Sequence, residues 1–125
     1  METFNFFEKA VAGIEFDEKQ TKDNESYGIH RVCTASGCIE FVKLYKNMVY
    51  KPHIHDRASA KFIFLSGTGK VIIGDEEILY SEGLICSVPA GVMHGFIQHE
   101  ETIFLSVQSN PIQDRSSGEI DIRYE

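Results

Sequence analysis

The sequence predicts an all-β domain, either a sandwich or a barrel, and two observations support this prediction. From Tyr27 onward, short apolar segments follow one another, each bounded by Gly, Asn, Asp, Ser or Pro. β-branched and aromatic residues dominate several of them, and no segment of useful length after residue 26 has helical periodicity. Many short strands at close spacing are typical of sandwiches and barrels. The segments expected as strands include residues 38–45, 60–65, 70–73, 77–80, 84–88, 94–97 and 102–107.

The length of 125 residues fits one domain, and 42% hydrophobic with 25% charged residues is ordinary globular composition. We expect the barrel to comprise residues 27–112, between an N-terminal extension (1–26) and a polar C-terminal tail (113–125). In the extension, the spacing of Phe4, Phe7, Val11 and Ile14 predicts a short amphipathic helix. Gly13 weakens this prediction, so an edge strand is the alternative. Residues 15–26 are highly charged and are expected to form a surface connection.

Charge and hydropathy exclude several classes of partner. The net charge of −7 with no basic stripe disfavours nucleic-acid binding. The longest apolar runs are too short to span a membrane. The N-terminus carries no secretory signal, so the expected location is the cytoplasm. There Cys33, Cys38 and Cys86 would be reduced thiols, although Cys33 and Cys38 flank a segment that could place them opposite each other in a hairpin.

Two short motifs carry residues suited to metal binding. Lys51-Pro52-His53-Ile54-His55 places two imidazoles at i and i+2, on the same side of a strand and about 7 Å apart at the backbone. Such a pair can hold one metal ion, although alone it is more often a chance surface pair. In the second motif, Pro89 and Gly91 form a tight turn that leads into a new strand at His94.

Together the two motifs resemble those of the cupin superfamily in residue type and spacing. The first cupin motif contains His-x-His, a glutamate and a glycine, and here His53, His55, Ala60 and Gly67 lie at the matching intervals. The second contains a glycine, Pro-x-Gly, a histidine and an asparagine, which correspond here to Gly83, Pro89, Gly91, His94 and Gln98. The resemblance covers residues 47–98. It implies a double-stranded β-helix, or jelly-roll, barrel with His53, His55 and His94 as metal ligands.

Three positions depart from the cupin pattern. Asn47 replaces the first glycine, and asparagine tolerates left-handed backbone geometry well. Gln98 replaces the asparagine, which is an amide-for-amide change. Ala60 replaces the glutamate ligand, and Lys61 cannot substitute because it points to the opposite face. What takes the place of this glutamate is left open.

Three histidines still form a complete protein ligand set in some metalloenzymes. Imidazole-only ligation suits zinc, copper, iron or nickel, one divalent ion of which is the expected cofactor. Three neutral ligands leave the charge of the ion uncompensated, which favours open coordination positions and an anionic or enolisable ligand. Some cupin dioxygenases are similar in holding non-haem iron with three histidines and no glutamate.

Strand parity indicates which side chains line the pocket. Phe62 and Phe64 share the face of position 60, Phe96 and Gln98 share the face of His94, and Lys51 lies on the histidine side. Tyr45 is a further candidate, as pocket residue or as base. Ile63 and Leu65 point the other way, so this strand is apolar on both faces, which favours a homodimer.

Three functions remain open from the sequence. The first is a metal-dependent enzyme acting on a small anionic or carbonyl-containing metabolite, either a dioxygenase-like oxidoreductase or an isomerase or lyase. Its catalytic residues are not identified, because no carboxylate remains within the motifs. The second is a non-catalytic cupin that binds or senses a small molecule, and the third is a metal-free barrel with a structural role.

Overall fold

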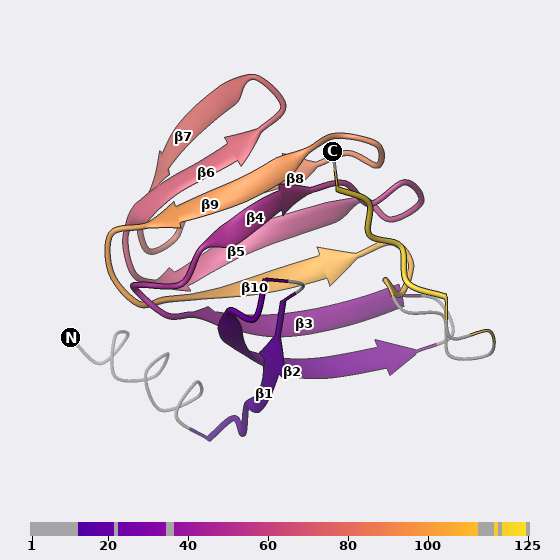
Figure 1. Cartoon of the computed structure of the whole chain (residues 1–125), viewed down its shortest axis with the longest axis horizontal. Coiled ribbons are helices and arrows are strands. Elements are labelled where there is room, and N and C mark those ends of the chain that lie inside the picture. The colour runs from indigo at the N-terminus through magenta and orange to yellow at the C-terminus, as the bar shows by residue number, and fades with distance from the viewer. Residues whose placement is uncertain (1–12, 22, 35–36, 113–116, 118, 125) are drawn as a thin grey trace.

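The computed structural model describes residues 13–124 except 22, 35–36, 113–116 and 118, and these form two antiparallel sheets facing each other (Figure 1). The six-stranded sheet has the order β1-β2-β3-β10-β5-β8 and the four-stranded sheet has the order β4-β9-β6-β7. The strands are β1 (Asp17–Gln20), β2 (Ser26–Thr34), β3 (Gly37–Leu44), β4 (Tyr50–His53), β5 (Ala60–Ser66), β6 (Gly69–Ile73), β7 (Glu76–Tyr80), β8 (Ile85–Val88), β9 (His94–Gln98) and β10 (Thr102–Gln108).

This architecture confirms the all-β jelly-roll fold that the sequence predicts. Each strand expected from the apolar segments is present, and its ends lie within one residue of the expected positions. The N-terminal helix or edge strand was expected in residues 4–14, nearly all of which lie outside the described residues. Residues 15–26 are not only a surface connection, because β1 pairs with β2 at the edge of the larger sheet. No helix among the described residues is long and apolar enough to cross a membrane.

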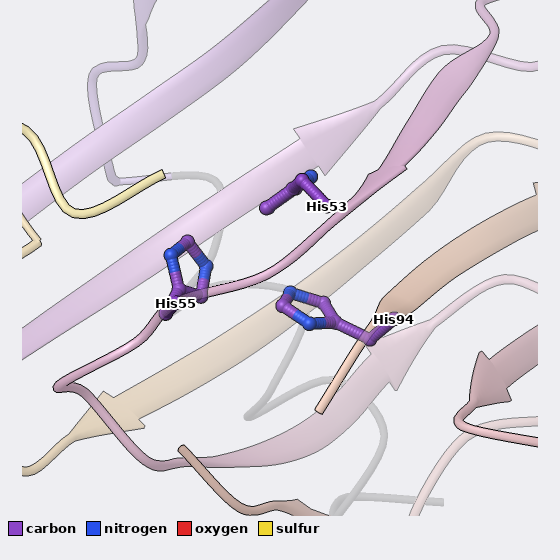
Figure 2. A group of neighbouring side chains, drawn as sticks. All are labelled: His53, His55 and His94. Carbon is purple, nitrogen blue, oxygen red and sulfur yellow. The ribbon is translucent and has the colours of Figure 1, made fainter. Parts of the chain in front are cut away.

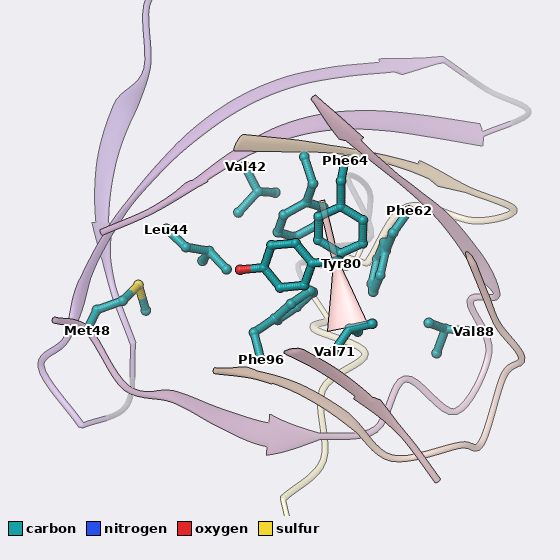
Figure 3. Close-up of a cluster of buried hydrophobic side chains, with 10 residues drawn as sticks. Val42, Leu44, Met48, Phe62, Phe64, Val71, Tyr80, Val88 and Phe96 are labelled. Atoms are coloured by element: carbon teal, nitrogen blue, oxygen red, sulfur yellow. The ribbon is translucent and has the colours of Figure 1, made fainter. Parts of the chain in front are cut away.

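The core lies between the two sheets and is largely aromatic (Figure 3). Phe62, Phe64 and Phe104 come from the six-stranded sheet, whereas Tyr80 and Phe96 come from the four-stranded sheet. The rings of Phe64 and Tyr80 stack with centroids 4.1 Å apart, and those of Phe96 and Phe104 stack at 4.8 Å. These contacts join the sheets, since each pair has one ring from each sheet and aromatic pairs add to the stabilisation from burial.

Glycines at the predicted turns have the backbone conformation that only glycine adopts readily. Gly67 and Gly91 have φ of 94° and 82°, as the turn residues of the two motifs require. Asn47, by contrast, does not adopt left-handed backbone geometry. Among the described residues, the one non-glycine residue with positive φ is Asn24.

The cysteines differ from the expectation that all three are reduced. Cys33 and Cys38 are directly opposite each other in the β2·β3 ladder, as their flanking of a hairpin segment suggested. Cys38 is disulfide-bonded, so the prediction of a reduced thiol is wrong at this position. Cys86 is a free thiol on β8.

Candidate metal centre

The fold brings His53, His55 and His94 together at one end of the smaller sheet (Figure 2). His53 ends β4 and pairs directly with His94, the first residue of β9. His55 follows two residues after His53. One ligand nitrogen from each residue lies within 4.8 Å of the other two, and all three side chains are buried. Residues from distant parts of the sequence therefore present three imidazoles to one small volume.

Backbone carbonyls fix which nitrogen of each ring is available. His53 Nδ1 lies 3.0 Å from the carbonyl oxygen of Lys51, and His55 Nδ1 lies 2.6 Å from that of Asp121. His94 Nδ1 makes a longer contact of 3.4 Å with the carbonyl oxygen of Val92. Because a carbonyl only accepts, each Nδ1 carries the proton and each Nε2 keeps a lone pair, which on His53 also accepts from the Tyr50 hydroxyl at 3.2 Å. This arrangement is typical of metal-bound histidines, so the residues fit a metal ion held on three Nε2 atoms.

Burial keeps two of these rings neutral. Loss of hydration, together with a smaller effect of the neighbouring histidines, lowers the pKa of His53 to about 4 and that of His94 to about 3. His94 Nε2 is buried and has no hydrogen-bond partner. A buried acceptor without a partner is unfavourable, and a bound cation would satisfy it. The site therefore offers lone pairs, rather than protons, at neutral pH.

The C-terminal segment supports the site from outside the barrel. Arg123 forms a bridge with Ile54, and the carbonyl oxygen of Asp121 accepts the hydrogen bond from His55. The Asp121 carboxylate accepts hydrogen bonds from the backbone N–H groups of Asp56, Arg57 and Ala58, at 2.8, 2.9 and 3.0 Å. These bonds lower the pKa of Asp121 despite its burial. Residues 119–124 thus hold the loop that carries His55.

Sequence reasoning missed this support because the contacts span more than 60 residues. The signal that could have indicated it is the alternation of Ile120, Ile122 and Tyr124 with polar residues, which is typical of an extended segment with one apolar side.

A cavity of about 260 Å³ adjoins His53. Its apolar wall comprises Ile29, Val42, Ile112, Ile120 and Ile122. Its polar lining includes Tyr27, Arg31, Glu40, Tyr50, Lys51 and Tyr124. The Tyr50 hydroxyl lies 3.2 Å from His53 Nε2, and burial raises the pKa of Tyr50 well above its usual value. This hydroxyl is therefore a hydrogen-bond donor next to the three histidines, and it does not act as a base.

Two of the predicted pocket residues lie at a cavity. Lys51 lines the cavity beside His53, and its Nζ lies 5.3 Å from the ring centroid of Tyr124. Phe62 lines a smaller cavity beside His94, and the two ring centroids are 5.8 Å apart.

The other predicted pocket residues line neither cavity. Phe64 and Phe96 pack in the aromatic core. Gln98 donates from Nε2 to the carbonyl oxygens of Tyr45 and Met48, and thereby holds the turn after β3. The Tyr45 hydroxyl bonds to the carboxylate of Glu18 on the outer side of the sheet, and this bond raises the pKa of Tyr45 to about 12.

Glu40 is one of the pocket residues that sequence reasoning did not single out. It shares the inner face of β3 with Val42 and Leu44, and its side chain is buried. The sequence presented two alternating faces in this strand without deciding which one looks inward. The structure shows that the face carrying Glu40 looks inward, whereas Phe41, Lys43 and Tyr45 lie on the opposite face.

Comparison with known proteins agrees with this geometry. The model of the cupin domain family matches residues 41–107. Similar solved structures include KdgF from Halomonas sp., which is 22% identical with a TM-score of 0.66 and covers 76% of this chain and 86% of that one. A protein described as a predicted oxalate decarboxylase from Thermotoga maritima is 14% identical, with a TM-score of 0.69, and covers 80% and 96%.

A third similar structure is the formate complex of oxalate decarboxylase from Lactobacillus farciminis, at 14% identity and a TM-score of 0.66. It covers 87% of this chain and 33% of that one. At these identities the likeness concerns the fold alone. A search of curated proteins gave no match.

Removing the Asp121 carboxylate is expected to loosen the His55 loop. In Asp121→Ala, three backbone N–H groups lose a charged acceptor, which is expected to lower the free energy of unfolding by at least about 2 kcal/mol. The affinity for Zn²⁺ is expected to fall about 10- to 100-fold, because the carbonyl that orients His55 is no longer held in place. Denaturant unfolding and isothermal titration calorimetry measure the two effects. Glu119→Ala, which removes an exposed ion pair with Arg57, is the control and should change neither.

The stability of the metal-free protein is expected to depend on pH through His53 and His94. Their folded-state pKa values of about 4 and 3 lie below the usual histidine pKa of 6.5, so the unfolded chain binds protons first as the pH falls. The stability that these neutral rings contribute is complete above pH 6.5 and is lost as the pH decreases toward 4 and 3.

Urea unfolding of the metal-free protein at about pH 7, 5.5 and 4.5 measures the slope of the free energy of unfolding against pH. Each unit of difference between the folded and unfolded pKa contributes about 1.4 kcal/mol to this free energy. His94→Gln should flatten the slope, whereas substitution of the exposed His99 by Gln should leave it unchanged. Equal slopes in the wild type and His94→Gln would contradict the assignment.

Proposed function

This chain belongs to the cupin family, and we propose that within this family it is a metal-dependent protein acting on a small metabolite that carries an anionic or carbonyl group. The observation that carries the proposal is the presentation of three Nε2 lone pairs, from His53, His55 and His94, beside a cavity of about 260 Å³. Iron, zinc, nickel or copper suits an all-imidazole ligand set.

The charge of the ligand set favours an anionic partner. When bound, the ion would supply a Lewis acid whose double positive charge the three neutral imidazoles do not compensate. Lys51 adds a second positive charge at the cavity that adjoins His53. Arg31 contributes less, because its Nε lies 2.5 Å from the Glu40 carboxylate. A carboxylate or an enolisable carbonyl on the metabolite would therefore be attracted locally, although the whole chain carries a net charge of −7.

The cavity also limits the size and orientation of the metabolite. A volume of about 260 Å³ is slightly below the range of about 300–1,000 Å³ for ligand pockets, so it suits a small organic acid rather than a polymer segment. Ile29 and Val42 provide an apolar wall, and the protonated Tyr50 hydroxyl can donate a hydrogen bond to a ligand oxygen beside His53. We propose oxygen-dependent cleavage of such a metabolite with Fe(II) as the first reaction to test, followed by isomerisation or lyase chemistry.

A non-catalytic binding or sensing role is the second candidate, and one observation favours it. Among the residues described at the cavity, Glu40 is the carboxylate that could act as a general base, but both of its oxygens accept hydrogen bonds from the protein. Oε2 accepts from Arg31 and Oε1 accepts from Gln108 at 2.6 Å. A carboxylate held in this way has no oxygen open to a substrate, because each oxygen already accepts a hydrogen bond from the protein.

Metal analysis and oxygen uptake separate these functions. Protein purified without a polyhistidine tag is expected to contain about one transition-metal ion per chain, and His94→Ala is expected to lose it, while the exposed His99→Ala retains it. The Fe(II)-loaded wild type is then tested for oxygen consumption, and for isomer or elimination products, across a panel of small keto and hydroxy acids. Uptake that depends on substrate and on His94 supports the enzyme. Metal-dependent binding without turnover supports the binding role, and absence of any metal affinity overturns both.

We further propose that the chain forms a homodimer through the outer face of the six-stranded sheet. Val32, Ile39 and Val107 are 51%, 40% and 39% exposed, and they lie side by side across β2, β3 and β10. Ile85, which is 58% exposed, lies at the far edge of the same sheet. An apolar row of this kind on a sheet face is typical of an interface between subunits.

Sedimentation at micromolar concentration tests this dimer. The wild type is expected to sediment as a dimer and Ile39→Glu as a monomer, since a carboxylate buried in the interface is costly. Leu79→Glu, at a 71% exposed position on the other sheet, is the matched control and should remain dimeric. A monomeric wild type would contradict the proposal.

A further inference from the structure

Ala60 stands where the resemblance to cupins places a glutamate ligand, and the space beside it is lined by buried polar side chains. Ala60 is the first residue of β5, and it lines a cavity of about 30 Å³ together with His55 and His94. Glu40 and Gln108 line the same cavity. Apolar side chains make up much of the remaining lining, and a cavity of this size with several polar groups in its wall holds about one water molecule. The site thus has a small compartment with polar groups in its wall on the side from which the carboxylate ligand is missing.

The strand register places Gln108 over this compartment. Gln108 on β10 is directly opposite Ala60 on β5, and residues opposite each other on one face have Cβ atoms about 5 Å apart. Its side chain is 5% exposed. An alanine on β5 therefore leaves room that the longer amide on the neighbouring strand can reach.

Hydrogen bonds determine which end of the Gln108 amide is free. Its Nε2 lies 2.6 Å from Oε1 of Glu40 and 3.1 Å from Oγ of Ser106. Because an ionised carboxylate only accepts, the nitrogen must face Glu40, and the carbonyl oxygen Oε1 must be the other end. Arg31 bonds to the second oxygen of Glu40, which fixes the carboxylate and balances its charge. The orientation of Gln108 thus follows from the Arg31–Glu40 pair.

Two acceptor atoms at this compartment have no hydrogen-bond partner among the residues that the structure describes. Gln108 Oε1 and His94 Nε2 are both fully buried and make no hydrogen bond, and their side chains line the same cavity. Buried polar atoms are nearly always satisfied, so each such exception calls for an explanation. A metal ion would satisfy His94 Nε2, and a hydrogen-bond donor such as a water molecule would satisfy the amide oxygen.

We propose that Gln108 is a positioning residue of the metal centre, and that its Oε1 accepts a hydrogen bond from a water ligand of the ion held beside Ala60. This inference rests on the proposed metal site. In the compartment that a glutamate occupies in the cupin pattern, Gln108 would orient the water, Glu40 would hold Gln108, and Arg31 would hold Glu40. A neutral amide contributes no charge, so the centre keeps its affinity for an anionic ligand while one of its coordination positions is oriented.

Two substitutions test the role of Gln108 from opposite sides of the compartment. Gln108→Leu removes the acceptor, and Ala60→Val fills the space while leaving the Gln108–Glu40 bond in place. Each is expected to weaken Zn²⁺ binding about 10- to 100-fold in calorimetric titration. Each is also expected to change the visible absorption bands of the Co²⁺-loaded protein, which report the number and geometry of the ligands.

The control is Thr102→Val on the same face of β10. Thr102 is also fully buried, but its hydroxyl bonds to Tyr80 at the other end of the barrel, so this variant should keep the Zn²⁺ affinity and Co²⁺ spectrum of the wild type. If Gln108→Leu does not fold, Ala60→Val decides the question.

The outcomes separate the two proposals. Wild-type affinity and spectrum in the folded variants would overturn the role of Gln108 and leave the three-histidine site standing. A wild type that binds neither Zn²⁺ nor Co²⁺ would overturn the proposed function and this inference with it. Weakened binding in both variants, with the control unchanged, supports the assignment.

Discussion

The antiparallel pairing of β4 with β9 is the constraint on which the site depends. It sets His53 directly opposite His94, although 40 residues separate them in the chain. Because side chains alternate along a strand, a slip of one residue in this ladder would turn one of the two rings toward solvent. The register is held by the buried face of the sheet, where Phe96 packs against Tyr50 on β4 and against Phe104 in the opposite sheet. The relative position of these two histidines is therefore a consequence of core packing.

A second level of control acts on ring orientation. The carbonyls of Lys51 and Val92 lie two residues before the histidines that they orient, so local backbone geometry selects the protonated nitrogen. His55 differs, because its carbonyl partner is Asp121 near the C-terminus. The carboxylate of Asp121 also holds the loop after β4, because it accepts hydrogen bonds from three backbone N–H groups of that loop. The position of the third ring thus depends on the docking of residues 119–124, which links the integrity of the site to a segment outside the two sheets.

The sequence predicted what local patterns determine and missed what long-range contacts determine. Alternation and turn residues located the strands, and the resemblance of the two motifs to those of cupins identified His53, His55 and His94 as the three rings that the fold brings together. Parity also placed Phe62 and Phe64 on the inner face. It could not decide between the two faces of β3, since Glu40 and Phe41 both occur in an alternating segment, and so Tyr45 was favoured over Glu40. Nor could it detect the support from Asp121, which needs a partner 65 residues away.

The replacement of glutamate by Ala60 changes the electrostatics of the site more than its geometry. A carboxylate ligand would cancel one of the two positive charges of a divalent ion, whereas three imidazoles cancel none. Among the described residues, Glu40 is the only carboxylate that lines the cavities beside these rings, and Arg31 balances its charge at 2.5 Å. The negative charge of Glu40 is therefore balanced within the protein by Arg31. A bound metal ion would retain its full attraction for an anionic ligand. A chain with a net charge of −7 repels anions at a distance, so this local excess of positive charge is what could draw an anionic metabolite into the cavity.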